Sequence, residues 1–193
     1  MANFEPAFQN TMKFEDPRHT GKVTVDAGGR TRFGIAEKFN ANLPEEFFTG
    51  DKENALHIAE MRMEENYWRA GGFAQINDQA VANKLFDMAV NMGVHQAVVY
   101  GQRAANALLT KSGQLSSAAD LESKGDPQPA VPLFPLVVDG ELGPKSAELI
   151  NSLDPLQYYQ LLCEFSREHY KHVAAISPAQ AVNLNGWLKR ADA

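Results

Sequence analysis

The sequence has 193 residues, of which 44% are apolar and 22% are charged, enough for one globular domain with a sizeable core. Asp and Glu number 24 against 18 Lys and Arg, so the formal net charge is −6. This acidic surplus argues against a nucleic-acid-binding protein held by phosphate contacts and against a polybasic membrane-surface protein. The single cysteine, Cys163, cannot form an internal disulfide, and a cysteine-based zinc site is excluded as well.

The sequence shows neither the pattern of a membrane span nor that of a signal peptide. No apolar run approaches the roughly 18 residues of a membrane span. The first residues, 1–6, lack both the basic and the apolar region of a signal peptide. We therefore expect a protein that is synthesised in the cytoplasm without a signal peptide, does not insert into membranes, and needs a special route if it acts elsewhere.

Residues 4–15 are predicted to form an amphipathic helix. At about 100° per residue, Phe4, Phe8 and Met12 fall on one stripe, and Glu15 falls near the middle of it. Pro17 prevents the helix from continuing. The pattern therefore predicts a carboxyl group that points inward at the C-terminal end of the helix.

Residues 20–36 change to a period of two. The alternating runs 22–26 and 30–35 flank the turn residues 27–29, which predicts a small β-hairpin near the N-terminus. Most of the remaining chain has helical periodicity, and residues 113–138 form a connection rich in Ser, Gly and Pro. The predicted fold class is mostly α (α+β), with helices at 51–70, 78–92, 95–111, 144–152, 155–173 and 178–189.

Glu15 is the first candidate for chemistry. A carboxyl on an apolar stripe loses hydration, which disfavours its charged form, and a protonated carboxyl can donate a proton to a leaving oxygen. The alternative is that Glu15 only ends the helix, half exposed and paired with Arg18. The adjacent Asp16 points about 100° away and is expected to be solvated or to cap the helix.

Polar residues on the hairpin offer a second group. A glycosidase needs one across the sugar from the acid, to hold a water or to stabilise an oxocarbenium ion. Asp26, Thr24 and Thr31 are of suitable types for that task. Asp26 before a glycine turn is equally typical of an ordinary turn residue.

Three further residues are candidates for binding. Trp68 at a helix end could stack on a sugar ring, although core packing is the commoner use of such a side chain. Asp87 and Asn91 lie one turn apart on one helix face. They would either line a cleft or form a buried hydrogen-bonded pair.

No metal site or cofactor site is predicted. His169 and His172 have i, i+3 spacing, but a third ligand is missing from the pattern, which favours a surface pair. Cys163 lies in an apolar run typical of a buried residue. The glycines match neither nucleotide-binding fingerprint.

Taken in order, these segments resemble a known family. Glu15, followed by Ala27-Gly28-Gly29-Arg30-Thr31-Arg32-Phe33-Gly34-Ile35, resembles the Glu-Gly-Gly … Gly-Gly-x-Thr-x-Tyr-Gly-Ile signature of glycoside hydrolase family 108. The resemblance continues through Tyr67-Trp68 and through residues 81–93 and 102–104. Residues 138–145 and 186–191 resemble the peptidoglycan-binding segment that is usual in this family.

The resemblance implies a lysozyme-like helical domain and an N-acetylmuramidase activity on peptidoglycan. The general acid of the family's Glu-Gly-Gly motif falls on Glu15, but Asp16-Pro17 replaces the two glycines, so the loop that shapes the cleft should differ. Related lysozymes with a Glu-Asp-Thr arrangement suggest Asp26 and Thr31 as the other catalytic residues. Substrate-binding candidates are Trp68, Asp87 and Asn91.

The resemblance also implies the reaction and its setting. The expected reaction is cleavage of the β-1,4 bond between N-acetylmuramic acid and N-acetylglucosamine, without metal or cofactor, causing cell-wall lysis as in phage endolysins or secretion-associated muramidases. A lytic transglycosylase and a non-catalytic peptidoglycan-binding protein are the alternatives. The expected partner is the glycan strand of peptidoglycan, reached by a monomer in the periplasm or cell wall after holin-type or specialised export.

For domain organisation, the sequence predicts a muramidase region at 1–112, the connection 113–138 and a peptidoglycan-binding-like helical segment at 139–193. The family label suggests a separable C-terminal module. A segment of about 55 residues without disulfides or metal is marginal as an independent domain. We therefore expect residues 139–193 to pack on the first region as one globule.

Overall fold

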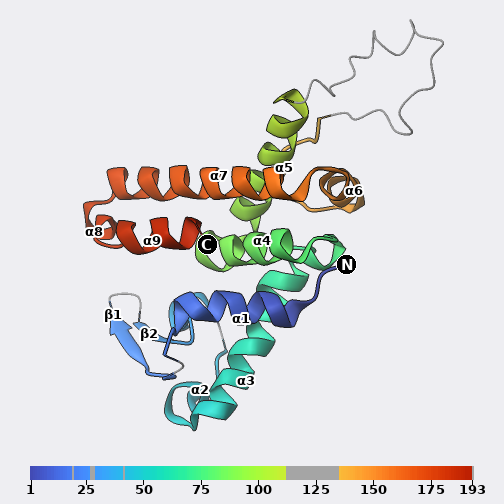
Figure 1. The fold of residues 1–193 in the computed structure, drawn as a ribbon. Coiled ribbons are helices and arrows are strands. Elements are labelled where there is room, and N and C mark those ends of the chain that lie inside the picture. Colours follow the sequence, from blue (N-terminus) through green and yellow to red (C-terminus); the bar gives the residue numbers. More distant parts are fainter. Residues whose placement is uncertain (19, 27–28, 41, 112–134, 193) are drawn as a thin grey trace, which may run out of the picture.

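The computed structural model describes residues 1–18, 20–26, 29–40, 42–111 and 135–192, with residue 26 described by its backbone only. The predicted fold class is confirmed, because helices dominate the described chain and a small antiparallel sheet is formed early in the sequence, by residues 24–36 (Figure 1). The turn residues 27–28 and residues 112–134, which include most of the predicted connection 113–138, lie outside the described residues.

Helix α1 (Phe4–Glu15) has the predicted bounds. It buries Ala7, Phe8, Thr11 and Met12 against helix α4. The strands β1 (Thr24–Asp26), β2 (Gly29–Arg32) and β3 (Ile35–Ala36) follow. The apolar stripe on α1 thus fixes which way the end of this helix points.

The sheet has one strand more than the sequence predicted. Strand β2 pairs with β1 and also with β3, so residues 30–35 do not form one continuous strand. Phe33 and Gly34 make a two-residue turn between β2 and β3 with positive φ values of 49° and 76°. Such turns match the twist of antiparallel strands, and this one returns the chain toward the end of α1.

The middle of the chain forms a helical layer around α4. Acidic N-caps begin two of its helices: Asp51 accepts a hydrogen bond from Asn54 N at 2.8 Å, and Asp78 accepts one from Val81 N at 2.9 Å. The described elements are a 3₁₀ turn (Glu37–Phe39), α2 (Glu45–Thr49), α3 (Lys52–Met63), a π-helical segment (Glu64–Arg69), a second 3₁₀ turn (Phe73–Gln75), α4 (Gln79–Met92) and α5 (Val94–Lys111).

The C-terminal segment contains α6 (Pro144–Ser152), α7 (Pro155–Ile176), α8 (Pro178–Ala181) and α9 (Leu184–Ala191). The helix predicted at 178–189 is therefore broken into two. Helix α7 packs against α4 and α5, and the short α8 lets α9 return along α7 toward α4 (Figure 1). This return brings the last residues of the chain beside α1 and α4.

One continuous hydrophobic cluster joins the two ends of the chain. It contains Phe8 and Leu85 from the N-terminal region together with Leu149, Tyr158 and Leu162 from the C-terminal helices. The Tyr158 hydroxyl is fully buried and donates to the Gly101 carbonyl at 3.0 Å. Because buried polar groups need partners, this bond fixes α7 on α5.

Candidate functional site

A pocket of about 250 Å³ lies where the end of α1 meets the small sheet. The lining residues come from the end of α1, the loop after it, and strands β1 and β2. They are Glu15, Asp16, Pro17, Thr20, Lys22, Thr24, Thr31, Phe33 and Gly34. The pocket therefore brings together Glu15 and Thr31, two of the residues that the sequence predicted to be catalytic.

Glu15 is the last residue of α1, and its side chain is 18% exposed. Its carboxylate accepts a hydrogen bond at Oε1 from Arg190 Nη1 at 2.7 Å, not from Arg18 as the alternative interpretation supposed. The sequence predicted a carboxyl among apolar side chains. The structure instead places an arginine beside it that lies 175 residues away in the chain.

Asp16 shapes the loop that follows Glu15. Asp16 is the C-cap residue of α1 and is 9% exposed, so of the two expectations capping is confirmed and solvation is not. Its Oδ2 accepts a hydrogen bond from Gly21 N at 2.6 Å, and its Oδ1 accepts one from the Thr20 hydroxyl at 3.2 Å. Asp16 and Pro17, which replace the glycines of the family signature, thus hold a tight loop at the pocket wall.

Thr24 and Thr31 face each other across the β1–β2 pair. The Thr24 hydroxyl donates to the Thr31 carbonyl at 3.4 Å, and both residues line the pocket. Asp26 lies opposite Gly29 at the end of β1, which is the turn end of the pair. The two threonines therefore line the same pocket as Glu15.

Arg30 anchors strand β2 to the helices beside it. Its guanidinium donates to Glu37 Oε1 at 2.7 Å and to Glu45 Oε1 at 2.6 Å, and it stacks over the Phe48 ring at 4.1 Å. Hydrogen bonding to this guanidinium lowers the pKa of both carboxyl groups. Since bidentate arginine pairs fix orientation, Arg30 holds the strand that carries Thr31.

Arg190 is a functional candidate that the sequence analysis missed. It lies on α9, its side chain is 8% exposed, and its Nε donates to both oxygens of Asp87, at 3.1 Å to Oδ1 and 3.0 Å to Oδ2. Burial opposes its charge, but the Asp87 and Glu15 carboxylates outweigh burial and raise the pKa of Arg190 above its usual range. Arg190 lies within residues 186–191, which resemble the family's peptidoglycan-binding segment, but no local pattern there predicts that it contacts a residue on α1.

Asp87 is 3% exposed and does not line the pocket in the described part of the chain. Besides Arg190 it binds the Thr11 hydroxyl, which donates to Oδ1 at 3.2 Å. The placement matches the alternative of a buried hydrogen-bonded group, although its partners are Arg190 and Thr11 and not Asn91. A direct contact between Asp87 and substrate is therefore not supported by this structure.

Trp68 lies in the core and not on an open surface. The residue is 4% exposed and packs against Phe4, Phe73 and Phe86, with ring centroids about 6 Å apart. The π-helical segment directs this side chain inward, so the commoner use, core packing, describes it here. Asn91 is half-buried on α4 and is outside the set of described residues that line the pocket.

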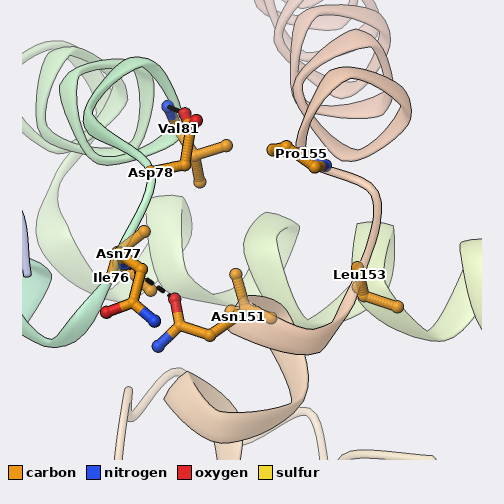
Figure 2. A pocket seen from close by; sticks show the side chains of 8 residues that line it. Ile76, Asn77, Asp78, Val81, Asn151, Leu153 and Pro155 are labelled. Carbon is orange, nitrogen blue, oxygen red and sulfur yellow. Dashed lines mark hydrogen bonds between the residues drawn. The ribbon is translucent and has the colours of Figure 1, made fainter.

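A second pocket, of about 310 Å³, lies between the start of α4 and the α6–α7 junction (Figure 2). Its polar side chains already have partners. Asn151 Oδ1 accepts from Asn77 N at 2.7 Å, Asn151 Nδ2 donates to the Gln75 carbonyl at 2.8 Å, and Asp78 caps α4. These bonds tie the C-terminal helices to the N-terminal region.

Among the described residues, no group of three or more His, Cys, Asp and Glu side chains is placed to hold a metal ion. His169 instead contacts Tyr100, with 3.1 Å between Nδ1 and the hydroxyl. No helix in the described part of the chain is both long and apolar enough to cross a bilayer.

Comparison with known proteins agrees with the sequence resemblance. Residues 10–93 match the family model described as glycosyl hydrolase 108. The comparison with curated proteins gave no match. A solved structure described as "Structure of Brucella abortus SagA" has a similar fold, with a TM-score of 0.59 and 16% identity over 97% of this chain and 92% of that one.

The matched residues contain the C-terminal half of α1, the sheet and α4, and thus the pocket and its carboxyl group, but not Arg190. The C-terminal segment lies beyond them, and its resemblance to a peptidoglycan-binding segment stays a prediction. The match over residues 10–93 makes this part of the chain similar to glycosyl hydrolase 108 and indicates that the protein is a glycoside hydrolase.

Proposed function

We propose that this glycoside hydrolase is an N-acetylmuramidase that cleaves the β-1,4 bond between N-acetylmuramic acid and N-acetylglucosamine in peptidoglycan. The observation that carries the proposal is the position of Glu15. A partly exposed carboxyl at a helix end lines the same pocket as two threonines, inside the region matched to a glycosidase family. Glycoside hydrolysis needs a proton donor on one side of the scissile bond and a group on the other side.

Glu15 is assigned the role of general acid. In its protonated form it donates a proton to the glycosidic oxygen as the bond from that oxygen to the anomeric carbon breaks. Its position supports this role, because the side chain is fixed by Arg190 at Oε1 and still lines the pocket. A fixed acid loses little time in unproductive orientations, which favours proton transfer.

Thr31 is assigned to hold the water that attacks the anomeric carbon, with Thr24 beside it. Its support is the shared pocket wall and the rigid anchoring of β2 by Arg30. Asp26 is proposed as an electrostatic partner of the developing positive charge, from the Glu-Asp-Thr arrangement of related lysozymes. Trp68 and Asp87 are assigned supporting roles in the structure instead of contacts with the glycan, because both are buried. Asn91 remains a proposed substrate-binding residue.

The products of purified peptidoglycan test the proposal. The full-length protein should release fragments with reducing muramic acid ends, detected by mass spectrometry. Fragments with 1,6-anhydro ends would instead show a lytic transglycosylase. Binding to sedimented peptidoglycan without any released fragment would show a non-catalytic wall-binding protein.

The setting of the reaction follows from its substrate. We infer that the protein acts as a monomer on glycan strands in the periplasm or cell wall, that its action lyses bacteria, and that export uses a holin-type or specialised route. The C-terminal helices are proposed to contact peptidoglycan while packed on the catalytic region. Lysis of cells exposed to the protein from the periplasmic side, but not from the cytoplasmic side, is the expected result.

A further inference from the structure

Arg190 lies between two carboxylates that come from different helices. Its Nη1 donates to Glu15 on α1 at 2.7 Å, while its Nε donates to both oxygens of Asp87 on α4. The three side chains are all largely enclosed, with exposures of 8% for Arg190, 18% for Glu15 and 4% for Asp87. Charged groups that are withdrawn from water interact strongly, so the charge state of each one affects the others.

Two lysine contacts fix the helix that carries Arg190. Lys84 lies on α4 one turn before Asp87, is 3% exposed, and its Nζ donates to the main-chain carbonyls of Arg190 at 2.9 Å and Ala191 at 2.8 Å. Carbonyls at a helix C-terminus have no partner within the helix, and a lysine is suited to bind them. Lys84 and Asp87 together therefore hold the end of α9 and the guanidinium of Arg190 on one face of α4.

The charges of this cluster bear on the use of Glu15 as an acid. A single arginine beside Glu15 would favour its ionised form and would oppose protonation. Arg190, however, also pairs with the Asp87 carboxylate through both of its oxygens. When Glu15 takes up a proton, Arg190 keeps Asp87 as its counter-charge, and the ammonium group of Lys84 keeps the two carbonyls that it binds.

We propose that Arg190 is a positioning residue of the catalytic centre and that Asp87 neutralises it, so that Glu15 is held in place and can still take up and donate a proton. The inference rests on the proposed role of Glu15. It makes the C-terminal helix α9 a part of the catalytic centre, beyond any contact it makes with peptidoglycan. Neither residue needs to touch the substrate.

Four other charged or titratable side chains named by the structure lie near Glu15 or line the same pocket. Tyr67 on the π-helical segment and Tyr170 on α7 interact with its charge, and burial chiefly raises the pKa of both tyrosines, so both stay neutral in the working range. Lys22 lines the pocket wall, and Asp16 follows Glu15 in the chain. These groups are unchanged in the variants below, so they contribute equally to every profile.

The test compares the pH dependence of peptidoglycan cleavage by full-length wild type, Arg190→Gln, Arg190→Lys and Asp87→Asn at constant ionic strength. Activity that needs a protonated Glu15 falls as the pH rises. In Arg190→Gln the Glu15 carboxylate loses its counter-charge. The alkaline limb of the profile of activity against pH should therefore shift to a higher pH, by about 1 unit. In Asp87→Asn the charge of Arg190 is no longer balanced, so the same limb should move down by a comparable amount.

Arg190→Lys keeps the charge but cannot bridge two carboxylates with a planar fork. It should leave the limb near its wild-type position, lower kcat and leave KM nearly unchanged. The matched control is Arg167→Gln, because Arg167 on α7 pairs with Asp192 next to the same end of α9 but does not touch Glu15. This control should reproduce the wild-type profile.

Limb shifts in opposite directions support the inference, since a purely structural role would lower stability and activity without moving the limbs apart. Unmoved limbs in Arg190→Gln and Asp87→Asn, each folded by circular dichroism, would overturn it. Failure of the near-isosteric Asp87→Asn to fold would also overturn it, because the cluster would then serve to hold the fold. If Glu15→Gln remains active or wild type releases no fragments, it is the proposed function that has failed, whatever the limbs do.

Discussion

Gly34 lies directly against Glu15. A Cβ atom added at Gly34 would be 2.7 Å from Glu15 Oε2 and 2.9 Å from its Cδ, closer than such atoms approach in proteins. Gly34 also has a φ of 76°, which side chains other than glycine rarely adopt. The turn after β2 therefore packs directly against the side chain of the proposed general acid.

Substitution Gly34→Ala should reduce activity by more than its effect on stability explains. The added methyl group must displace the Glu15 carboxyl, and a displacement of about 1 Å can cost about 10²-fold in rate. The left-handed backbone adds a destabilisation of roughly 1–2 kcal/mol. Peptidoglycan cleavage and thermal unfolding are to be measured on the same sample.

Gly93→Ala is the matched control for this prediction. Gly93 has a φ of 91° at the end of α4, but a Cβ there would meet nothing within 4 Å. With a ψ of 149° its backbone lies in a region that is essentially confined to glycine, so Gly93→Ala should lose at least as much stability as Gly34→Ala. It should nevertheless keep near wild-type activity at low temperature. Equal activities of the two variants would contradict the claim that a methyl group at Gly34 displaces the Glu15 carboxyl.

Glu15→Gln should abolish cleavage and leave the fold intact. The amide keeps the shape and can still accept the hydrogen bond from Arg190, but it has no carboxylic proton to donate. General acid catalysis contributes about 10²–10⁴-fold, so a retained activity above about a tenth of wild type would be incompatible with the assigned role. The melting temperature should be unchanged or higher, since active-site carboxyl groups are often held at a cost in stability.

Thr31 and Asp26 on the hairpin are the two candidates for the second catalytic group, opposite the general acid. Thr31→Val nearly preserves the shape and removes the hydroxyl, so it should lower kcat without unfolding if Thr31 holds the attacking water. Thr110→Val, at an exposed helical threonine that donates to the Asn106 carbonyl at 2.9 Å, is its control. Asp26→Asn should lower activity if Asp26 is the electrostatic partner.

The two hairpin variants are informative together. Full activity in one of them assigns the role to the other residue. Full activity in both removes the hairpin from the mechanism and leaves Glu15 acting with solvent alone.

A chain truncated after Gly125 should be insoluble or inactive. The truncation removes Arg190 and its contact with Asp87, and it uncovers the face of α5 where Tyr158 donates to the Gly101 carbonyl. A large apolar surface would become exposed, because the C-terminal helices share one hydrophobic cluster with the rest of the chain. The measurements are soluble yield, thermal unfolding and peptidoglycan clearing; a soluble fragment that melts cooperatively near the full-length temperature and still clears peptidoglycan would establish two independent domains.

Local patterns predicted the elements well because their causes are local. The apolar stripe and Pro17 gave the helix 4–15 with its observed bounds, and the caps Asp51 and Asp78 mark helix starts in the structure. The extra strand was missed because its turn, Phe33-Gly34, places a bulky buried residue at positive φ. Propensity alone does not predict such a residue there.

The sequence by itself determined the helical fold class, the hairpin region, the family resemblance and the choice of Glu15 as the residue to examine. Only the tertiary structure decided what surrounds Glu15, because its partner Arg190 is 175 residues away and reaches it through the return of α9 along α7. It also decided that Trp68 and Asp87 are buried, since a helical period identifies a face but not the element that covers it. Long-range contacts of this kind depend on how the helices pack, and no local pattern of residues encodes them.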